Sequence, residues 1–118
     1  MSFQHEELKR RTKQFAIRIG KLFRSLPKTE EARTIGRQLL RSGTSVAANY
    51  RAVCRARSKA EFIAKIGVVV EEADETVFWL EMLVEATIVS AKKMDDLLRE
   101  ANELLAIFAA SQRTAKRR

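Results

Sequence analysis

The chain has 118 residues, of which 46% are hydrophobic and 32% are charged, a balance typical of one globular domain and not of a disordered chain. Its formal net charge is +8, and so basic a protein is expected to meet a polyanion or an acidic protein surface. The single cysteine excludes an internal disulfide, and no uncharged run approaches the ~18 residues of a membrane span. The N-terminus lacks the apolar core of a signal peptide, so we expect a cytoplasmic protein with no membrane partner.

Apolar residues at helical spacing, with only one proline and four glycines in the chain, predict a few long helices and no β fold. The first helix should end at Pro27, and Thr29 is a suitable N-cap for the second. Ser58 and Glu61 form the S-x-x-E pattern of a capping box, which should start the third. The predicted ranges are about 4–26, 29–57, 59–87 and 91–112, followed by a frayed basic tail over 113–118.

Four amphipathic helices with short connections predict an all-α fold, namely a single antiparallel up-down-up-down four-helix bundle over residues 1–118. Charge is divided unevenly among the helices. Residues 27–57 hold seven basic and two acidic side chains, whereas residues 58–87 hold two basic and seven acidic ones. Because the basic excess is regional, it indicates a functional surface and not a uniform aid to solubility.

Five arginines of the second helix fall within an arc of roughly 80° on a helical wheel. They are Arg33, Arg37, Arg41, Arg51 and Arg55. The simplest interpretation of these five arginines is a helix face in contact with solvent. Like charges at i,i+4 spacing repel each other, however, so a functional stripe should bind an anion that neutralises it. The planar guanidinium binds phosphate or carboxylate equally well. The anion is therefore nucleic-acid phosphate or the acidic surface of another subunit.

Small and polar residues lie in the middle of the second helix, where Gly43 and its neighbours would let another helix approach closely. We interpret Ser42 and Asn49 as residues whose side-chain hydrogen bonds fix helix register, since a buried amide without partners costs about 1–3 kcal/mol. A polar functional site at these two residues is the alternative.

The third helix carries a second apolar strip among its glutamates, separate from its core stripe. The strip consists of Val68, Phe78, Trp79 and Met82. A four-helix bundle buries one stripe per helix, so the extra strip predicts a partner surface and self-association. A core face that is merely wide is the alternative.

Residues for catalysis or metal binding are scarce. The only histidine is His5 and the only cysteine is Cys54, too few for a di-iron site, a zinc site or a plausible nucleophile pair. Glu71, Glu72 and Glu75 are most simply a solvated acidic face, and no glycine-rich phosphate loop is present. We therefore expect a protein that is not an enzyme and that has no metal and no cofactor.

Two long segments of the chain are similar to a known family: LPKTEEARTIGRQLLRSGTSVAANYRAVCRARS and KAEFIAKIGVVVEEADETVFWLEML. They resemble the bacterial four-helix-bundle proteins named for an open reading frame in intervening sequences of 23S ribosomal RNA genes. The resemblance runs from about Phe15 to Phe108. Many relatives have an acidic residue after the Asn-aromatic pair, where this chain has Arg51, so this surface is more basic than usual.

The resemblance implies an antiparallel four-helix protomer that assembles into a homopentameric ring, and the number five comes from the resemblance alone. A distant member, the accessory variability determinant of diversity-generating retroelements, forms such a ring and binds nucleic acid and a reverse transcriptase. The intervening-sequence branch itself has no settled activity. Its gene location makes RNA an attractive ligand.

Two hypotheses follow from these observations. In the first, a ring-forming module presents the arginine stripe, with help from the first and fourth helices, to RNA or DNA phosphates. In the second, the protein is a structural or adaptor oligomer whose arginine helix contacts protein, either in its own subunits or in a partner. A stripe open to solvent favours nucleic acid, and a stripe buried against the acidic third helix favours assembly.

Overall fold

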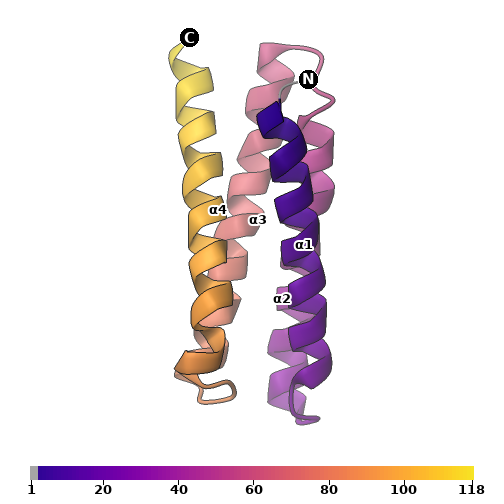
Figure 1. Cartoon of the computed structure of the whole chain (residues 1–118), viewed down its shortest axis with the longest axis vertical. Helices are drawn as coiled ribbons and strands as arrows, with labels where there is room; N and C mark the ends of the chain where they lie inside the picture. Colours follow the sequence, from indigo (N-terminus) through magenta and orange to yellow (C-terminus); the bar gives the residue numbers. More distant parts are fainter. Residues whose placement is uncertain (1–2) are drawn as a thin grey trace.

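The computed structural model describes residues 3–118, which contain four α-helices and no strand. The helices are α1 (Phe3–Ser25), α2 (Glu30–Val53), α3 (Lys59–Glu85) and α4 (Ala91–Arg117). They pack side by side in alternating directions within an elongated shape of 46 × 22 × 21 Å (Figure 1). The predicted all-α, antiparallel up-down-up-down four-helix bundle is thus confirmed.

Side-chain caps begin three of these helices, and the sequence predicted two of them, Thr29 and Ser58. Thr29 Oγ1 accepts a hydrogen bond from the Ala32 amide at 3.1 Å, and Ser90 Oγ accepts one from the Lys93 amide at 3.2 Å. Ser58 Oγ accepts from the Glu61 amide at 3.0 Å, as the capping box requires. The return bond goes one residue further back than the motif specifies, because Glu61 Oε1 accepts from the backbone amide of residue 57 at 2.7 Å.

The ends of α2 and α4 differ from their predicted positions. α2 ends at Val53 and not at residue 57, because the chain needs residues 54–57 to turn back toward the extended Ser58. The amides of Arg55 and Ala56 bond to carbonyls only three residues earlier, which tightens this turn. α4 continues to Arg117, so most of the tail predicted as frayed is helical. The tail contains no glycine or proline, and cations are favourable at a helix C-terminus.

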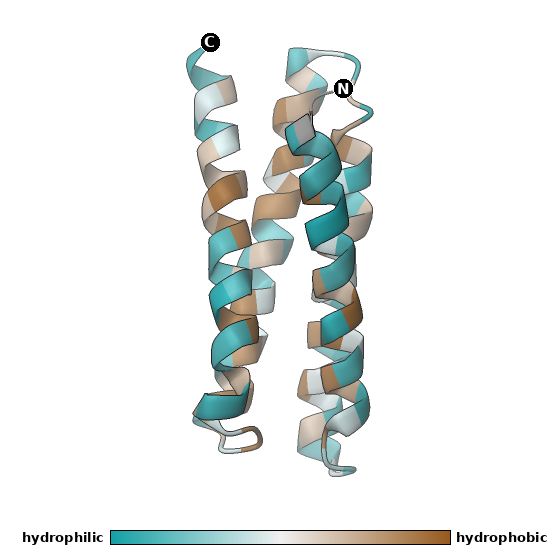
Figure 2. Ribbon diagram, in the orientation of Figure 1, coloured by the Kyte–Doolittle hydropathy of each residue, from teal (hydrophilic) through white to brown (hydrophobic). Residues whose placement is uncertain are grey.

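Each helix turns one apolar face toward its neighbours, and Figure 2 shows the hydrophilic residues on the outer side of α1 and α4. The largest side chains that are fully buried come from all four helices: Phe15, Ile19, Leu39, Ile66, Leu80, Leu83, Met94, Leu104 and Phe108. Tyr50 packs against Phe108 with 5.2 Å between ring centroids. Burial raises the pKa of the Tyr50 phenol, so this side chain serves the core.

α1 and α2 approach closely at two glycines of α2. A Cβ atom at Gly43 would lie 3.0 Å from Ile19 Cγ1, and one at Gly36 would lie 2.7 Å from Leu26 Cδ1. Because real Cβ atoms rarely approach so near, a larger side chain at either position would force a neighbouring side chain to move. The interpretation of Gly43 as a close-packing residue is thus confirmed.

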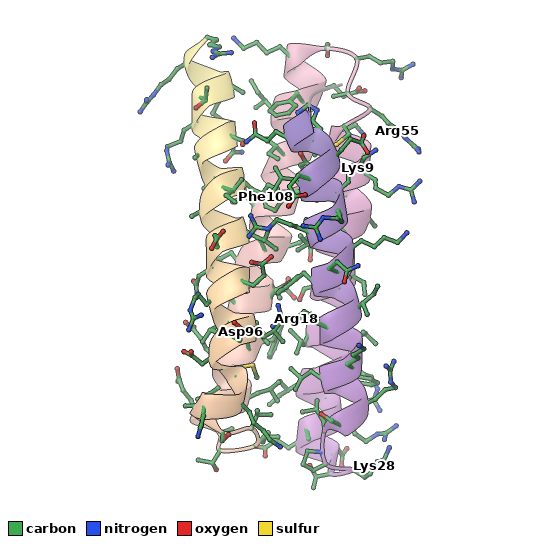
Figure 3. All side chains as sticks on the ribbon, viewed as in Figure 1. Lys9, Arg18, Lys28, Arg55, Asp96 and Phe108 are labelled. Atoms are coloured by element: carbon green, nitrogen blue, oxygen red, sulfur yellow. The ribbon has the colours of Figure 1, made fainter. Side chains whose placement is uncertain are left out.

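α1 packs much less closely on α4 than on α2, and ion pairs span this contact. The Arg11 guanidinium lies 2.8 Å from a Glu100 carboxylate oxygen and 2.9 Å from one of Glu103. Arg18 reaches Asp96 at 3.0 Å, and Figure 3 labels both residues on facing sides of the two helices.

No helix in the described part of the chain is both long enough and apolar enough to cross a membrane.

Candidate nucleic-acid interface

The predicted arginine stripe is only partly a helical feature. Arg33, Arg37, Arg41 and Arg51 lie on α2 and are exposed. Arg55 is exposed as well, but it lies beyond the end of α2 in the connection to α3. Its placement on the helical stripe was therefore wrong, because the chain turns at residue 54. Figure 3 shows Arg55 near the same end of the bundle as Lys9.

Arg41 is neutralised by α3 of its own chain. Its Nη1 lies 3.2 Å from Glu72 Oε1, and its Nη2 donates a short hydrogen bond to Glu75 Oε2. Glu75 also accepts from the Trp79 indole Nε1 at 3.1 Å. The hydrogen bond from Arg41 is the main cause that lowers the pKa of Glu75, and the Trp79 indole adds to it. Arg41 is thus less available to an external anion than the other members of the stripe.

The pairing of Arg41 was missed at the sequence level, where only phosphate or another subunit was considered as the anion. A signal for it was present. Arg41 precedes the α2–α3 connection by about as many residues as Glu72 follows it. Antiparallel neighbours bring such positions together.

The other four arginines have no internal counter-ion. Within residues 3–118 no carboxylate pairs with the side chains of Arg33, Arg37, Arg51 or Arg55. The positive charges of Arg33, Arg37 and Arg51 share one face of α2, and Arg55 adds an exposed charge just beyond its end. They are the part of the stripe that an external anion can neutralise.

A groove of about 570 Å³ runs between α1 and α2 beside Arg51. Its lining consists of Glu6, Lys9, Arg10 and Lys13 from α1, and Thr44, Ala47, Ala48 and Arg51 from α2. Four cations and one carboxylate therefore surround a floor of small side chains. Lys9 pairs with Glu6 at 3.1 Å and Arg10 with Glu7 at 2.6 Å, whereas Lys13 and Arg51 have no carboxylate partner in the described part of the chain.

The α1 residues of this groove were not identified individually from the sequence, which predicted only general help from the first helix. Their signal was the charge balance of residues 1–26, which hold seven basic and two acidic side chains. The helix pattern alone does not show which of those cations face α2. That choice depends on how α1 is rotated against its neighbour.

Ser42 and Asn49, the two predicted register residues, lie outside the groove lining. Ser42 is fully buried; its Oγ accepts from the Thr76 hydroxyl of α3 at 3.0 Å and donates to the Leu39 carbonyl at 3.3 Å. Asn49 Nδ2 donates to the carbonyl and hydroxyl oxygens of Ser45, at 2.9 and 2.7 Å. Ser42 thus links two helices, whereas the bonds of Asn49 stay within α2.

The predicted oligomer strip on α3 is half open to solvent. Phe78 and Val68 are 49% and 41% exposed, while Trp79 and Met82 are partly buried against the core. The Phe78 and Trp79 rings meet edge to face at 4.8 Å. Phe78 and Val68 are therefore the members of the strip that a partner could cover.

Cys54 is the C-cap of α2 and is half-buried. Burial raises the pKa of its thiol, which keeps the thiol protonated near neutral pH and makes it a poor nucleophile. His5 lies on α1. In the described part of the chain, no group of three or more His, Cys, Asp or Glu residues is arranged to hold a metal ion.

Comparisons with known proteins match almost the whole chain. A family model described as 23S rRNA-intervening sequence protein matches residues 4–110. The chain is also similar to a crystal structure from Bacteroides thetaiotaomicron, of a protein with unknown function from the S23 ribosomal protein family. The two chains are 29% identical with a TM-score of 0.85, over 94% of this chain and 99% of the other. No curated protein matches.

Proposed function

The chain belongs to the 23S rRNA-intervening sequence protein family, and from that premise we propose that it is a non-enzymatic, ring-forming bundle protein that binds RNA or DNA electrostatically. The binding surface is the basic α1–α2 face. We define this face as Arg33, Arg37, Arg51 and Arg55 together with Lys9, Arg10 and Lys13. The observation that carries the proposal is the set of four exposed arginines without an internal counter-ion.

Electrostatic binding fits this face because phosphate relieves the mutual repulsion of its cations and releases condensed counter-ions from the nucleic acid. No aromatic side chain lines the groove, so bases have no stacking platform there. Contacts to the backbone position a protein but carry no sequence information. The expected binding is therefore salt-dependent and weakly sequence-specific.

Self-association is proposed through the outer part of the α3 strip, around Phe78 and Val68, and the homopentamer is taken from the family resemblance. Glu71 and Asp74 are exposed on the same helix. A two-fold contact of this face with itself would bring like charges together, which is unfavourable. A head-to-tail contact, in which the α3 face meets a different and more basic surface of the next copy, avoids that repulsion and can close into a ring.

The binding proposal is tested by the affinity of labelled RNA and DNA oligonucleotides across a range of salt concentrations. Replacing Arg33, Arg37 and Arg51 together by Gln should reduce the slope of log affinity against log salt by about 2, at roughly 0.7 per lost contact with a single strand. Arg41 is left in place because it pairs with α3. The matched control replaces Lys92, Lys93 and Arg113 of α4 by Gln and should change the slope less. A parent protein that binds neither nucleic acid at low salt would end the proposal.

A structural or adaptor role is the second candidate, and the pairing of Arg41 with Glu72 and Glu75 favours it. That pairing gives one example of an α2 arginine that binds protein carboxylates. If the triple arginine variant dissociates into smaller species before it loses nucleic acid, the arginines serve assembly. Light scattering of the same samples distinguishes the two outcomes.

The oligomer is tested separately by Phe78→Glu, which should lower the mass in light scattering while helicity by circular dichroism is retained. Phe78 is a better choice than Trp79, because Trp79 is partly buried and hydrogen-bonds Glu75. Ala60→Glu, at an exposed position in the first turn of α3, serves as a control. A Phe78→Glu variant with the parent mass would place the interface elsewhere.

A further inference from the structure

The groove between α1 and α2 owes its space to small side chains. Its floor is formed by Thr44, Ala47 and Ala48, and its volume is about 570 Å³. The Thr44 hydroxyl donates to the Leu40 carbonyl at 2.7 Å within α2. The floor can therefore fit a ligand by its shape but forms few hydrogen bonds with it.

The walls of the groove carry positive charge on both sides. Lys9, Arg10 and Lys13 stand on the α1 wall and Arg51 on the α2 wall. Lys9 and Lys13 are one helical turn apart, so their charges follow one another along the groove. Glu6 is the one carboxylate of the lining, and it already pairs with Lys9 at 3.1 Å.

A groove between two packed helices has the width of one chain and not of a duplex. Neighbouring helix axes lie about 8–10 Å apart, so a duplex laid across this face spans both helices and meets mainly their ridges. Double-stranded DNA is stiff over about 150 base pairs, so it does not follow the local shape of the groove and presents one side of its backbone to the ridges. A flexible single strand can enter and be flanked by cations from both walls.

We propose that the α1–α2 groove is a track for one strand, with the phosphodiester backbone on the floor side and the bases outward, so that the protein prefers single-stranded RNA or DNA to duplex. The inference rests on the proposed nucleic-acid function and names the form of ligand that the site takes. Several cations in series favour a chain of phosphates over a free phosphate or mononucleotide, since each further contact along the strand adds to the affinity.

The first experiment compares ligands of equal length on the intact parent protein at one salt concentration, so the duplex carries about twice the phosphates of either single strand. A single-stranded RNA, the matching single-stranded DNA and the duplex of the latter are measured by fluorescence anisotropy, with a mononucleotide as competitor. We expect both single strands to bind about tenfold or more tightly than the duplex, in line with contacts from two walls in place of one. The mononucleotide should not compete at similar concentrations.

The second experiment fills the groove. Ala48→Leu adds bulk without charge at an exposed helical position and should reduce single-strand affinity about tenfold while duplex affinity is nearly unchanged. The matched control is Ala64→Leu, the same change at an exposed position of α3 that does not line the groove. Circular dichroism and the unfolding midpoint check that both variants fold.

A third experiment removes a charge from the groove without adding bulk, so its result does not depend on how the helices pack. Lys13→Gln should lower single-strand affinity and reduce the salt slope by about 0.7, whereas duplex binding should change less. Equal affinity for single strand and duplex, or full single-strand affinity in both Ala48→Leu and Lys13→Gln, overturns the track and leaves the electrostatic face standing. If the parent protein binds neither single strand nor duplex at low salt, the proposed nucleic-acid function is overturned as well.

Discussion

α2 meets both of its neighbours through small residues and a buried hydroxyl pair, whereas α1 meets α4 through ion pairs across a looser contact. At the α2 contacts, Gly43 touches Ile19 and Ser42 bonds Thr76, so volume and hydrogen bonding decide the fit. At the α1–α4 contact, Arg11 pairs with Glu100 and Glu103, so we expect its charge to matter more than its shape. The contacts of α2 should therefore be sensitive to added atoms, and the α1–α4 contact to salt.

The largest effect is expected where volume is added against α1. Gly43→Leu would place a side chain where even a Cβ lies 3.0 Å from Ile19 Cγ1, and overpacking of this kind costs about 1–3 kcal/mol. Urea unfolding should show a lower midpoint at an unchanged m value. The control is Gly20→Ala, where the nearest atom outside the local backbone is Arg24 Nη1 at 3.9 Å. There the better helix propensity should stabilise the protein by about 0.5–1 kcal/mol. Equal effects at both glycines would contradict the close approach.

A smaller effect is expected where the buried hydroxyl pair is broken. Thr76→Val keeps the shape of the side chain but removes the donor to Ser42, which should cost about 1 kcal/mol in the free energy of unfolding. Thr44→Val is the matched control, because the exposed Thr44 hydroxyl bonds only within its own helix. A variant at Thr76 no less stable than the one at Thr44 would show that the pair contributes nothing to the α2–α3 contact.

Ion pairs at the α1–α4 contact should contribute less, and their contribution should depend on salt. Arg11→Met removes the bonds to Glu100 and Glu103 and should cost about 1 kcal/mol or less at low ionic strength. The cost should shrink in high salt, because screening weakens partly exposed pairs. Arg99→Met removes exposed pairs with Asp95 and Asp96 within α4 and should change stability by only about 0.3–0.5 kcal/mol. A salt-independent loss at Arg11 would mean that its packing, not its charge, joins the helices.

The smallest effect is expected for the contribution of Glu75 to stability and for its loss at acidic pH. Its pKa is lowered in the folded protein by the hydrogen bonds from Arg41 and Trp79, so ionised Glu75 stabilises the fold above its ordinary pKa of 4.5. That contribution is lost as the pH falls through the lowered pKa. Glu75→Gln should cost about 0.2–1 kcal/mol at neutral pH, since the pair is partly exposed, and the difference from the parent should vanish in acid. Glu71→Gln, at an exposed side chain, should change little at either pH. A difference at Glu75 that persists in acid would contradict the linkage.

The close α1–α2 contact at Gly43 also positions the candidate binding site. Gly43 precedes Ala47 by one turn of α2, and both lie toward α1. The close approach at Gly43 therefore sets how near the Lys13 wall stands to the Arg51 wall. A bulky residue at Gly43 should widen the groove, so the comparison of contacts bears on binding as well as on stability.

Local patterns in the chain predicted most of the fold. Helical spacing of apolar residues predicted four helices in the right order, and Thr29 and Ser58 were predicted correctly as the N-caps of α2 and α3. These features succeed because helix periodicity and N-capping involve only residues within a turn or two. The end of α2 was missed, since no breaker marks Val53 and the turn depends on where α3 must begin.

The sequence by itself determined that Arg33, Arg37, Arg41 and Arg51 share one face of a helix, because that follows from 3.6 residues per turn. Only the tertiary structure decided that Arg41 is neutralised by Glu72 and Glu75 while Arg51 borders a groove with Lys13. Those outcomes depend on the rotation of each helix and its register against residues more than thirty positions away. Packing of the whole bundle sets both quantities, and no local pattern encodes them.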